Sequence, residues 1–110
     1  RVGGLFSNSQ KISNTLMDIS DKAGDPVWLM PIPHWTDQDL KSDFADLSNC
    51  GSGYGGAIAA AEFLRIFAPK DCQWFHLDLY CWTDSSRGPY RQKGGTGQCV
   101  QLLQSWVEGL

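Results

Sequence analysis

The chain has 110 residues, of which 42% are hydrophobic and 19% are charged, and its formal net charge is −3. This length fits a single globular domain with a modest core. The weak negative charge, with no basic stripe, argues against a nucleic-acid partner. No stretch resembles a signal peptide, a transmembrane helix or a lipidation motif, so no membrane partner is expected. Because the chain begins without Met, we expect a piece of a larger protein.

The four cysteines are widely and irregularly spaced: Cys50, Cys72, Cys81 and Cys99. Nothing in the sequence points to a secretory compartment, so we expect reduced thiols that pack as small hydrophobic side chains. A disulfide framework is the alternative.

Residues 7–24 predict a helix, because apolar residues recur there at spacings of four, three and four. They share one face: Ile12, Leu16, Ile19 and Ala23. Ser7 or Ser9 can cap its start, while Gly24 and Pro26 stop it.

The apolar run VWLMPI, residues 27–32, predicts a strand covered on both faces, as in a parallel sheet. A short helix is expected over residues 36–44, with Thr36 and Asp39 at capping-box spacing. Residues 44–49, FADLSN, predict a second short strand or extended segment.

The glycine-rich loop CGSGYGG, residues 50–56, opens a predicted helix over residues 57–68 that Pro69 ends. A face of small residues would let this helix lie close to a sheet: Ala57, Ala60, Ala61 and Leu64.

Residues 74–82, WFHLDLYCW, predict a third strand. A 13-residue polar loop follows at 83–95, long enough to be functional. The last helix is expected over residues 96–110, capped by Thr96, with Val100, Leu103 and Val107 facing inward. Helices and strands thus alternate, which predicts an α/β layered domain with a mainly parallel sheet and flanking helices.

Within the third strand, side-chain alternation places His76, Asp78 and Tyr80 on one face and Leu77, Leu79 and Cys81 on the other. A His and an Asp two positions apart could share a metal ion. A zinc site needs three or four ligands, however, and no metal-binding spacing accompanies them. We therefore interpret His76 and Asp78 as hydrogen-bonded structural residues, with Asp78 tying down a neighbouring loop.

Other motifs give weak indications of chemistry. Gly51, Gly53 and Gly56 satisfy GxGxxG, but the preceding segment is a poor buried strand, so close backbone packing at a helix start is favoured over a nucleotide site. No GxSxG elbow is present, and Ser7, Ser48 and Ser52 are interpreted as caps and turn residues. Cys99 lies near a helix start without an obvious catalytic partner.

Taken in order, the motifs GDPVWLMPI, SDFADLSNCGSGYGGAIAAAEFL, WFHLDLYCW and KGGTGQCVQLL resemble the C-terminal part of the leucyl (cytosol) aminopeptidase catalytic domain. The resemblance covers residues 1–110. It implies a cytoplasmic, hexameric enzyme, a homo-oligomer in which two divalent metal ions, zinc or manganese, activate water against the N-terminal peptide bond.

The same resemblance limits what can be assigned here. The family's ligands are a lysine and several carboxylates, several of them in an NTDAEGR-like motif that also supplies an arginine. No run of this chain matches that motif, so no metal ligand and no catalytic residue is transferred to it. His76 and Asp78 match a framework strand of the family rather than its metal site.

The resemblance does carry over substrate-binding positions. Those that line the pocket for the first side chain of a peptide substrate correspond to Cys50, Tyr80 and Thr83. Many members have small residues where this chain has Tyr80 and Cys81, and a Tyr there would shrink or reroute the pocket. We therefore interpret the chain as part of a metal-dependent aminopeptidase acting on peptides. The alternative is a non-catalytic α/β binding or assembly module.

Overall fold

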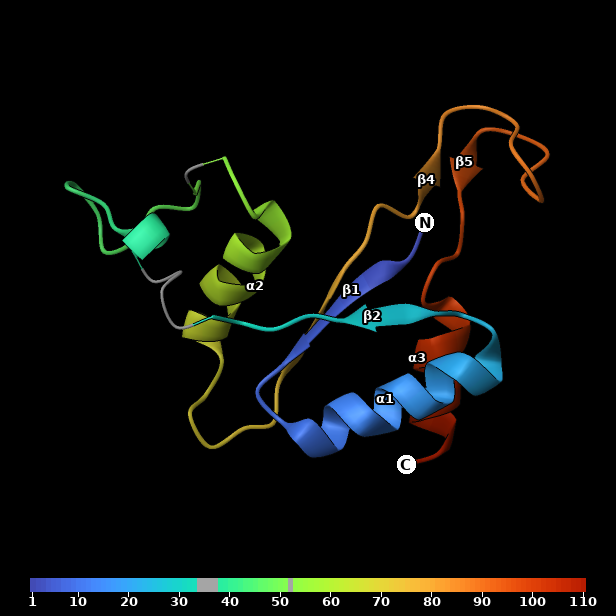
Figure 1. The fold of residues 1–110 in the computed structure, drawn as a ribbon, viewed down its shortest axis with the longest axis horizontal. Coiled ribbons are helices and arrows are strands. Elements are labelled where there is room, and N and C mark those ends of the chain that lie inside the picture. Colours follow the sequence, from blue (N-terminus) through green and yellow to red (C-terminus); the bar gives the residue numbers. More distant parts are fainter. Residues whose placement is uncertain (34–37, 52) are drawn as a thin grey trace.

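The computed structural model describes residues 1–33, 38–51 and 53–110 (Figure 1). Its main sheet has the order β2-β1-β3, built from Val27–Leu29, Gly3–Ser7 and Phe75–Asp78. Strand β1 runs parallel to β2 and antiparallel to β3. A small hairpin pairs β4 (Trp82–Thr83) with β5 (Gly94–Gly95). The helices are α1 (Gln10–Ala23), α2 (Gly56–Phe67) and α3 (Val100–Glu108).

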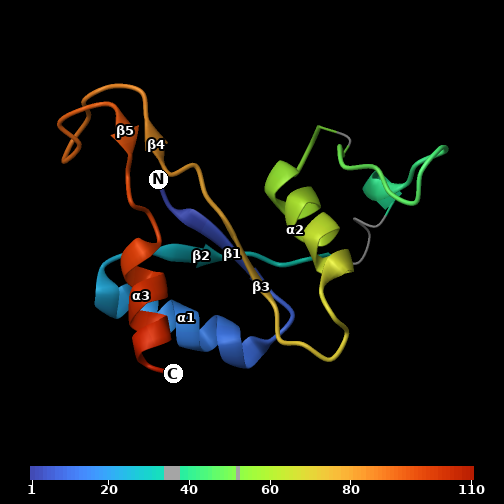
Figure 2. The same cartoon turned by 180° about the vertical axis from the view of Figure 1, so that it is seen from behind.

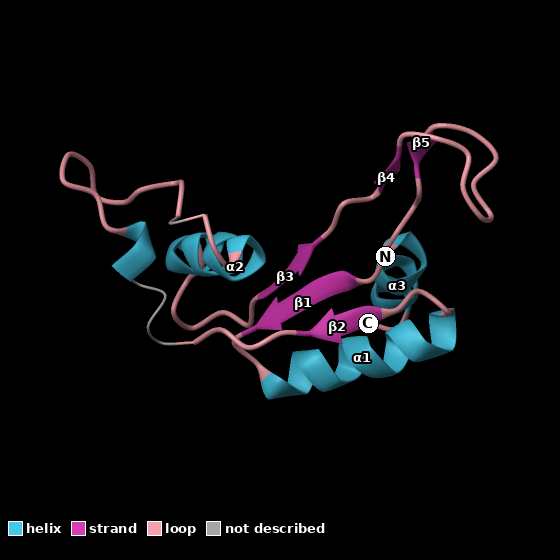
Figure 3. Cartoon of the chain, turned by 45° about the horizontal axis from the view of Figure 1, so that its top comes forward, coloured by secondary structure: helices cyan, strands magenta, loops and turns pink. Residues whose placement is uncertain are grey.

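The core lies between one face of this sheet and helices α1 and α3, which gather on that side (Figures 2 and 3). It is formed by five buried residues from β1, α1, β2 and the α3 terminus: Leu5, Leu16, Val27, Cys99 and Leu102. Helix α2 packs near β3, away from α1 and α3. The fold is thus mixed α/β, and it is thin, with extents of 47 × 35 × 17 Å.

Helix α1 forms as the sequence predicts. Ser9 is its N-cap, with the side-chain oxygen accepting a hydrogen bond from the Ile12 N–H, and Gly24 ends it in the left-handed conformation. Ser7 is not the cap. Its side chain lies just before the helix, and its hydroxyl donates a hydrogen bond to the Trp74 carbonyl at 2.6 Å. That bond ties the β1–α1 connection to the chain just before β3.

The expectation of a mainly parallel sheet is not met by the described strands. Residues 3–7 form the central strand β1, which the sequence analysis left out, and its pairing with β3 is antiparallel. Residues 44–49, expected to be extended or a strand, contain bends instead. The strand predicted over 74–82 is also divided, because Cys81 has a φ of 50° and separates β3 from β4.

Strand β2 is shorter than predicted and is not covered on both faces. Val27 is buried in the core, whereas Trp28 is 69% and Leu29 is 38% exposed. The described chain places α1 and α3 over one side of the sheet only. An apolar run was therefore a good indicator of a strand but a poor indicator of what covers it.

The predicted inward faces of the later helices are rotated. In α2 the buried residues are Ala61 and Glu62, while Ala60 is exposed and Leu64 is 43% exposed. Glu62 forms an ion pair with Arg65 one turn later. The prediction failed because a helix that is apolar all round does not indicate which side meets the sheet.

In α3 the inward residues are Leu102 and Trp106, which pack in and against the core. Val100 and Val107, expected to face inward, are 54% and 60% exposed. The helix begins after Cys99, so Thr96 is not its cap.

Between residues 33 and 56 the structure describes one short helical turn at residues 38–40 and a set of bends. The predicted cap Thr36 and the predicted turn residue Ser52 lie outside the described residues. Ser48 acts as a turn residue, as predicted, since its hydroxyl donates to the Cys50 carbonyl at 2.9 Å. At Gly51 an added Cβ would lie 3.3 Å from the Ala59 Cβ, which agrees with close packing at the start of α2. Among the described helices, none is long and apolar enough to cross a membrane.

Candidate functional site

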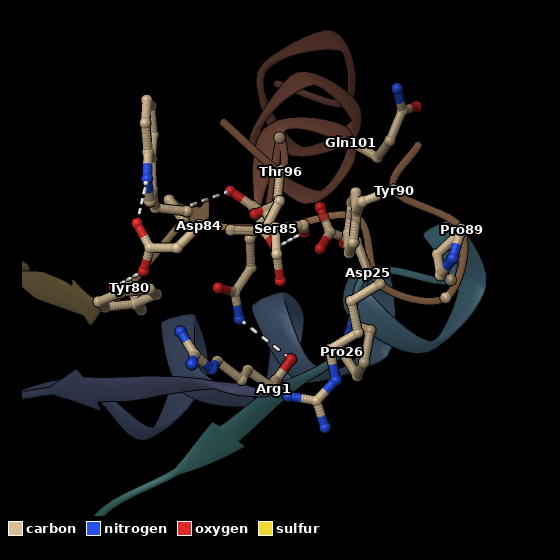
Figure 4. A pocket seen from close by; sticks show the side chains of 18 residues that line it. Arg1, Asp25, Pro26, Tyr80, Asp84, Ser85, Pro89, Tyr90, Thr96 and Gln101 are labelled. Carbon is tan, nitrogen blue, oxygen red and sulfur yellow. Dashed lines mark hydrogen bonds between the residues drawn. The ribbon is translucent and has the colours of Figure 1, made fainter. Parts of the chain in front are cut away.

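A cavity of about 720 Å³ lies between the first residue, the α1–β2 turn, the β4–β5 hairpin and the segment leading into α3 (Figure 4). Two of the three predicted substrate-binding residues, Tyr80 and Thr83, line it. Its charged lining comes from Arg1, Asp25, Asp84 and Arg87. The volume is within the range typical of sites for small ligands.

Three hydrogen-bonded side chains form one wall of this cavity. The Tyr80 hydroxyl donates to one carboxylate oxygen of Asp84 at 3.2 Å, and the Trp82 Nε1–H donates to the other at 3.1 Å. The Arg1 guanidinium carbon lies 4.1 Å from the centroid of the Tyr80 ring, a cation–π contact. The Tyr80 ring is therefore held at its hydroxyl and on one face.

Asp25, another lining residue of the cavity, holds the start of α3 in place. Its two carboxylate oxygens accept hydrogen bonds from the backbone N–H groups of Cys99, at 2.9 Å, and Leu102, at 3.3 Å. These are N–H groups at the start of α3, where a negative charge is favoured. Sequence analysis missed this role and assigned the cap to Thr96. A local pattern could not have found it, because the two partners are 74 and 77 positions away.

Two cysteines near the cavity have positive φ: Cys81, a lining residue, at 50°, and Cys99, which follows the lining residue Gln98, at 65°. The Cys81 carbonyl accepts a hydrogen bond from the Thr96 N–H at 2.9 Å, and its sulfur lies 3.5 Å from the Gln98 carbonyl oxygen. Burial, and to a lesser degree the nearby Asp25 and Cys81, raise the pKa of the Cys99 thiol to about 11. All four cysteines are free thiols, as expected.

The third predicted substrate-binding residue, Cys50, is not brought to the cavity. It is exposed and lies in the loop before α2, which both Figure 1 and Figure 2 place at the end of the molecule opposite the hairpin. This chain alone therefore joins Tyr80 and Thr83 but leaves Cys50 apart from them.

The strand residues His76 and Asp78 also lie outside the cavity lining. The His76 ring stacks against Phe6 and Trp74, with centroid separations of 6.0 and 6.3 Å. Its buried Nε2 has no hydrogen-bond partner among the described residues. Asp78 is half-buried, and its carboxylate makes no hydrogen bond to the residues that the structure describes. The expectation that both are hydrogen-bonded structural residues is thus not met.

A metal centre does not fit the described side chains. No group of three or more His, Cys, Asp or Glu residues in residues 1–33, 38–51 and 53–110 could hold a metal ion. Asp25 and Asp84, the two carboxylates at the cavity, are each engaged by two N–H or O–H donors of the chain itself. The chemistry that these residues support is therefore binding and shaping rather than metal coordination.

The chain is thus a mixed α/β domain with a cavity of small-ligand size. Comparison with known proteins shows the family to which it belongs. Residues 1–104 match the catalytic domain of the cytosol aminopeptidase family. A probable cytosol aminopeptidase of Synechocystis sp. is 41% identical over 111 residues, covering 99% of this chain and 22% of that protein.

Solved structures give the same result. The cytosol aminopeptidase of Coxiella burnetii superposes with a TM-score of 0.87 at 32% identity, covering 98% of this chain and 24% of its own. The bottromycin maturation enzyme BotP, solved in complex with Mn, gives a TM-score of 0.88 at 32% identity, with coverage of 99% and 24%. The chain therefore belongs to the cytosol aminopeptidase family, and it spans about a fifth of the length of the relatives it matches.

Proposed function

We propose that this chain is the C-terminal segment of the catalytic domain of a metal-dependent aminopeptidase, which releases N-terminal amino acids from peptides in the cytoplasm as a homo-oligomer. The observation that carries the proposal is the match of residues 1–104 to the family's catalytic domain. The manganese bound by BotP supports a divalent metal in the intact protein, zinc or manganese.

Within that enzyme, this chain's part is to shape the pocket for the substrate's first side chain. Tyr80 and Thr83 line the cavity, and the Tyr80 ring takes up space at the wall. Asp25 holds the start of α3 against the opposite side. The bound metal ions would supply the activated water, while the residues described here bind and orient the substrate. Cys50 does not line this cavity, so its proposed place in the substrate pocket would require other parts of the intact protein to bring the two together.

The test compares the intact protein with the isolated 110 residues on aminoacyl p-nitroanilides. The intact protein is expected to hydrolyse them with added Mn²⁺ or Zn²⁺ and to lose activity with a chelator. The 110 residues alone are expected to be inactive. An intact protein that hydrolyses no aminoacyl amide under any metal condition would contradict the proposal and favour a non-catalytic module.

A further inference from the structure

The side chain of Asp84 is the common partner of two aromatic residues at the cavity. It accepts one hydrogen bond from the Tyr80 hydroxyl and one from the Trp82 indole N–H, each on a separate oxygen. Figure 4 shows the Asp84 carboxylate next to the Tyr80 hydroxyl, to which a dashed line joins it. Asp84 thus bridges the end of β3 and the hairpin that begins with β4.

Without Asp84, little would fix the Tyr80 ring. Tyr80 is 55% exposed, so core packing does not determine its rotamer. The contacts that orient it are the hydrogen bond to Asp84 and the Arg1 guanidinium over its face. The backbone contributes a turn at Cys81, whose positive φ redirects the chain just after Tyr80.

We propose that Asp84 is a positioning residue that holds the Tyr80 ring in the cavity and thereby limits the size of the first side chain that the enzyme accepts. The inference rests on the proposed function and names a specificity determinant for it. A released ring can rotate toward solvent, which leaves room for a bulkier side chain. A neutral–charged hydrogen bond at a partly exposed site contributes enough to change a specificity ratio by about two- to tenfold.

The experiment measures kcat/KM of the intact enzyme for phenylalanine and alanine p-nitroanilides and follows their ratio. Asp84→Ala removes the acceptor, and Tyr80→Phe removes the donor but keeps the ring. Each variant should raise the phenylalanine-to-alanine ratio by about two- to tenfold. The double variant should raise it no further than either single one, because both changes remove the same bond.

Two further variants separate positioning from general stability. Asp84→Asn keeps an oxygen that can accept the Tyr80 hydroxyl, so it should restore part of the wild-type ratio. Asp18→Ala removes an exposed carboxylate on α1 that is not part of the cavity lining, and it should leave the ratio unchanged. If Asp84→Ala fails to fold, Tyr80→Phe still tests the same bond from its other end.

The outcomes are distinguishable. Equal loss of activity toward both substrates in Asp84→Ala, or additive ratios in the double variant, would show a merely structural Asp84 and overturn the inference. If Tyr80→Ala changes the phenylalanine-to-alanine ratio of kcat/KM and Asp84→Ala does not, the inference about Asp84 is overturned while the proposed function stands. A wild-type enzyme that hydrolyses neither substrate would contradict the proposed function and the inference with it.

Discussion

Asp25→Ala is expected to destabilise the chain by detaching the start of α3 from the α1–β2 turn. The native carboxylate accepts bonds of 2.9 Å from the Cys99 N–H and 3.3 Å from the Leu102 N–H. Alanine offers no acceptor, so both donors lose their partner. A lost helix cap costs about 0.5–2 kcal/mol. Since the partner is charged and Cys99 is fully buried, we expect a value near the upper end, about 2 kcal/mol.

Urea denaturation at fixed protein concentration gives the change in unfolding free energy, and a thermal melt should show a decrease of about 10 °C for a domain of this size. Hydrogen exchange adds a local readout, because the amides of Cys99 and Leu102 should lose protection before those of α1. Asp25→Asn keeps one acceptor oxygen and should lose about half as much. Asp18→Ala, on the exposed face of α1, is the matched control. An Asp25→Ala loss no greater than that of the control would refute the reasoning.

Four further outcomes are expected. In the intact enzyme, Tyr80→Ala should widen the pocket and raise kcat/KM for substrates with bulkier N-terminal residues relative to smaller ones, by a factor equivalent to about 1–3 kcal/mol. If the variant folds and its relative kcat/KM values across these substrates are unchanged, Tyr80 does not line the pocket. The isolated chain should self-associate, because Trp28 is 69% exposed on β2, which has only β1 as a described sheet partner; sedimentation that detects only monomer at all concentrations would contradict this. Alkylation should reach exposed Cys50 and Cys72 first and Cys99 last. Because the Cys99 pKa is raised to about 11 on folding, its contribution to stability should be complete below pH 9 and decline as the pH rises toward 11; a urea midpoint that is identical in wild type and Cys99→Ser across that range would contradict it.

Local patterns determined part of this protein. Helix α1 could be predicted with its cap at Ser9 and its stop at Gly24, because both signals lie within the segment that they govern. Side-chain alternation also predicted that Leu77 and Leu79 share one face, and in the structure both pack against the core. The family, likewise, was indicated by the order of motifs along the chain and is confirmed by the match over residues 1–104.

Tertiary structure alone decided the rest, since the deciding partners are distant in sequence. Gly3 and Gly4 give β1 little strand propensity, yet β1 is the central strand of the sheet. A Cβ at Gly3 would collide with the Leu79 side chain, which occupies the space that a larger residue would need. The cap of α3 comes from Asp25, 74 residues before Cys99, and no local pattern encodes it. The Tyr80–Asp84 wall depends on the turn at Cys81, which brings both side chains to one cavity. Sequence periodicity records what each segment can bury, whereas the other segments determine which face is buried and against what.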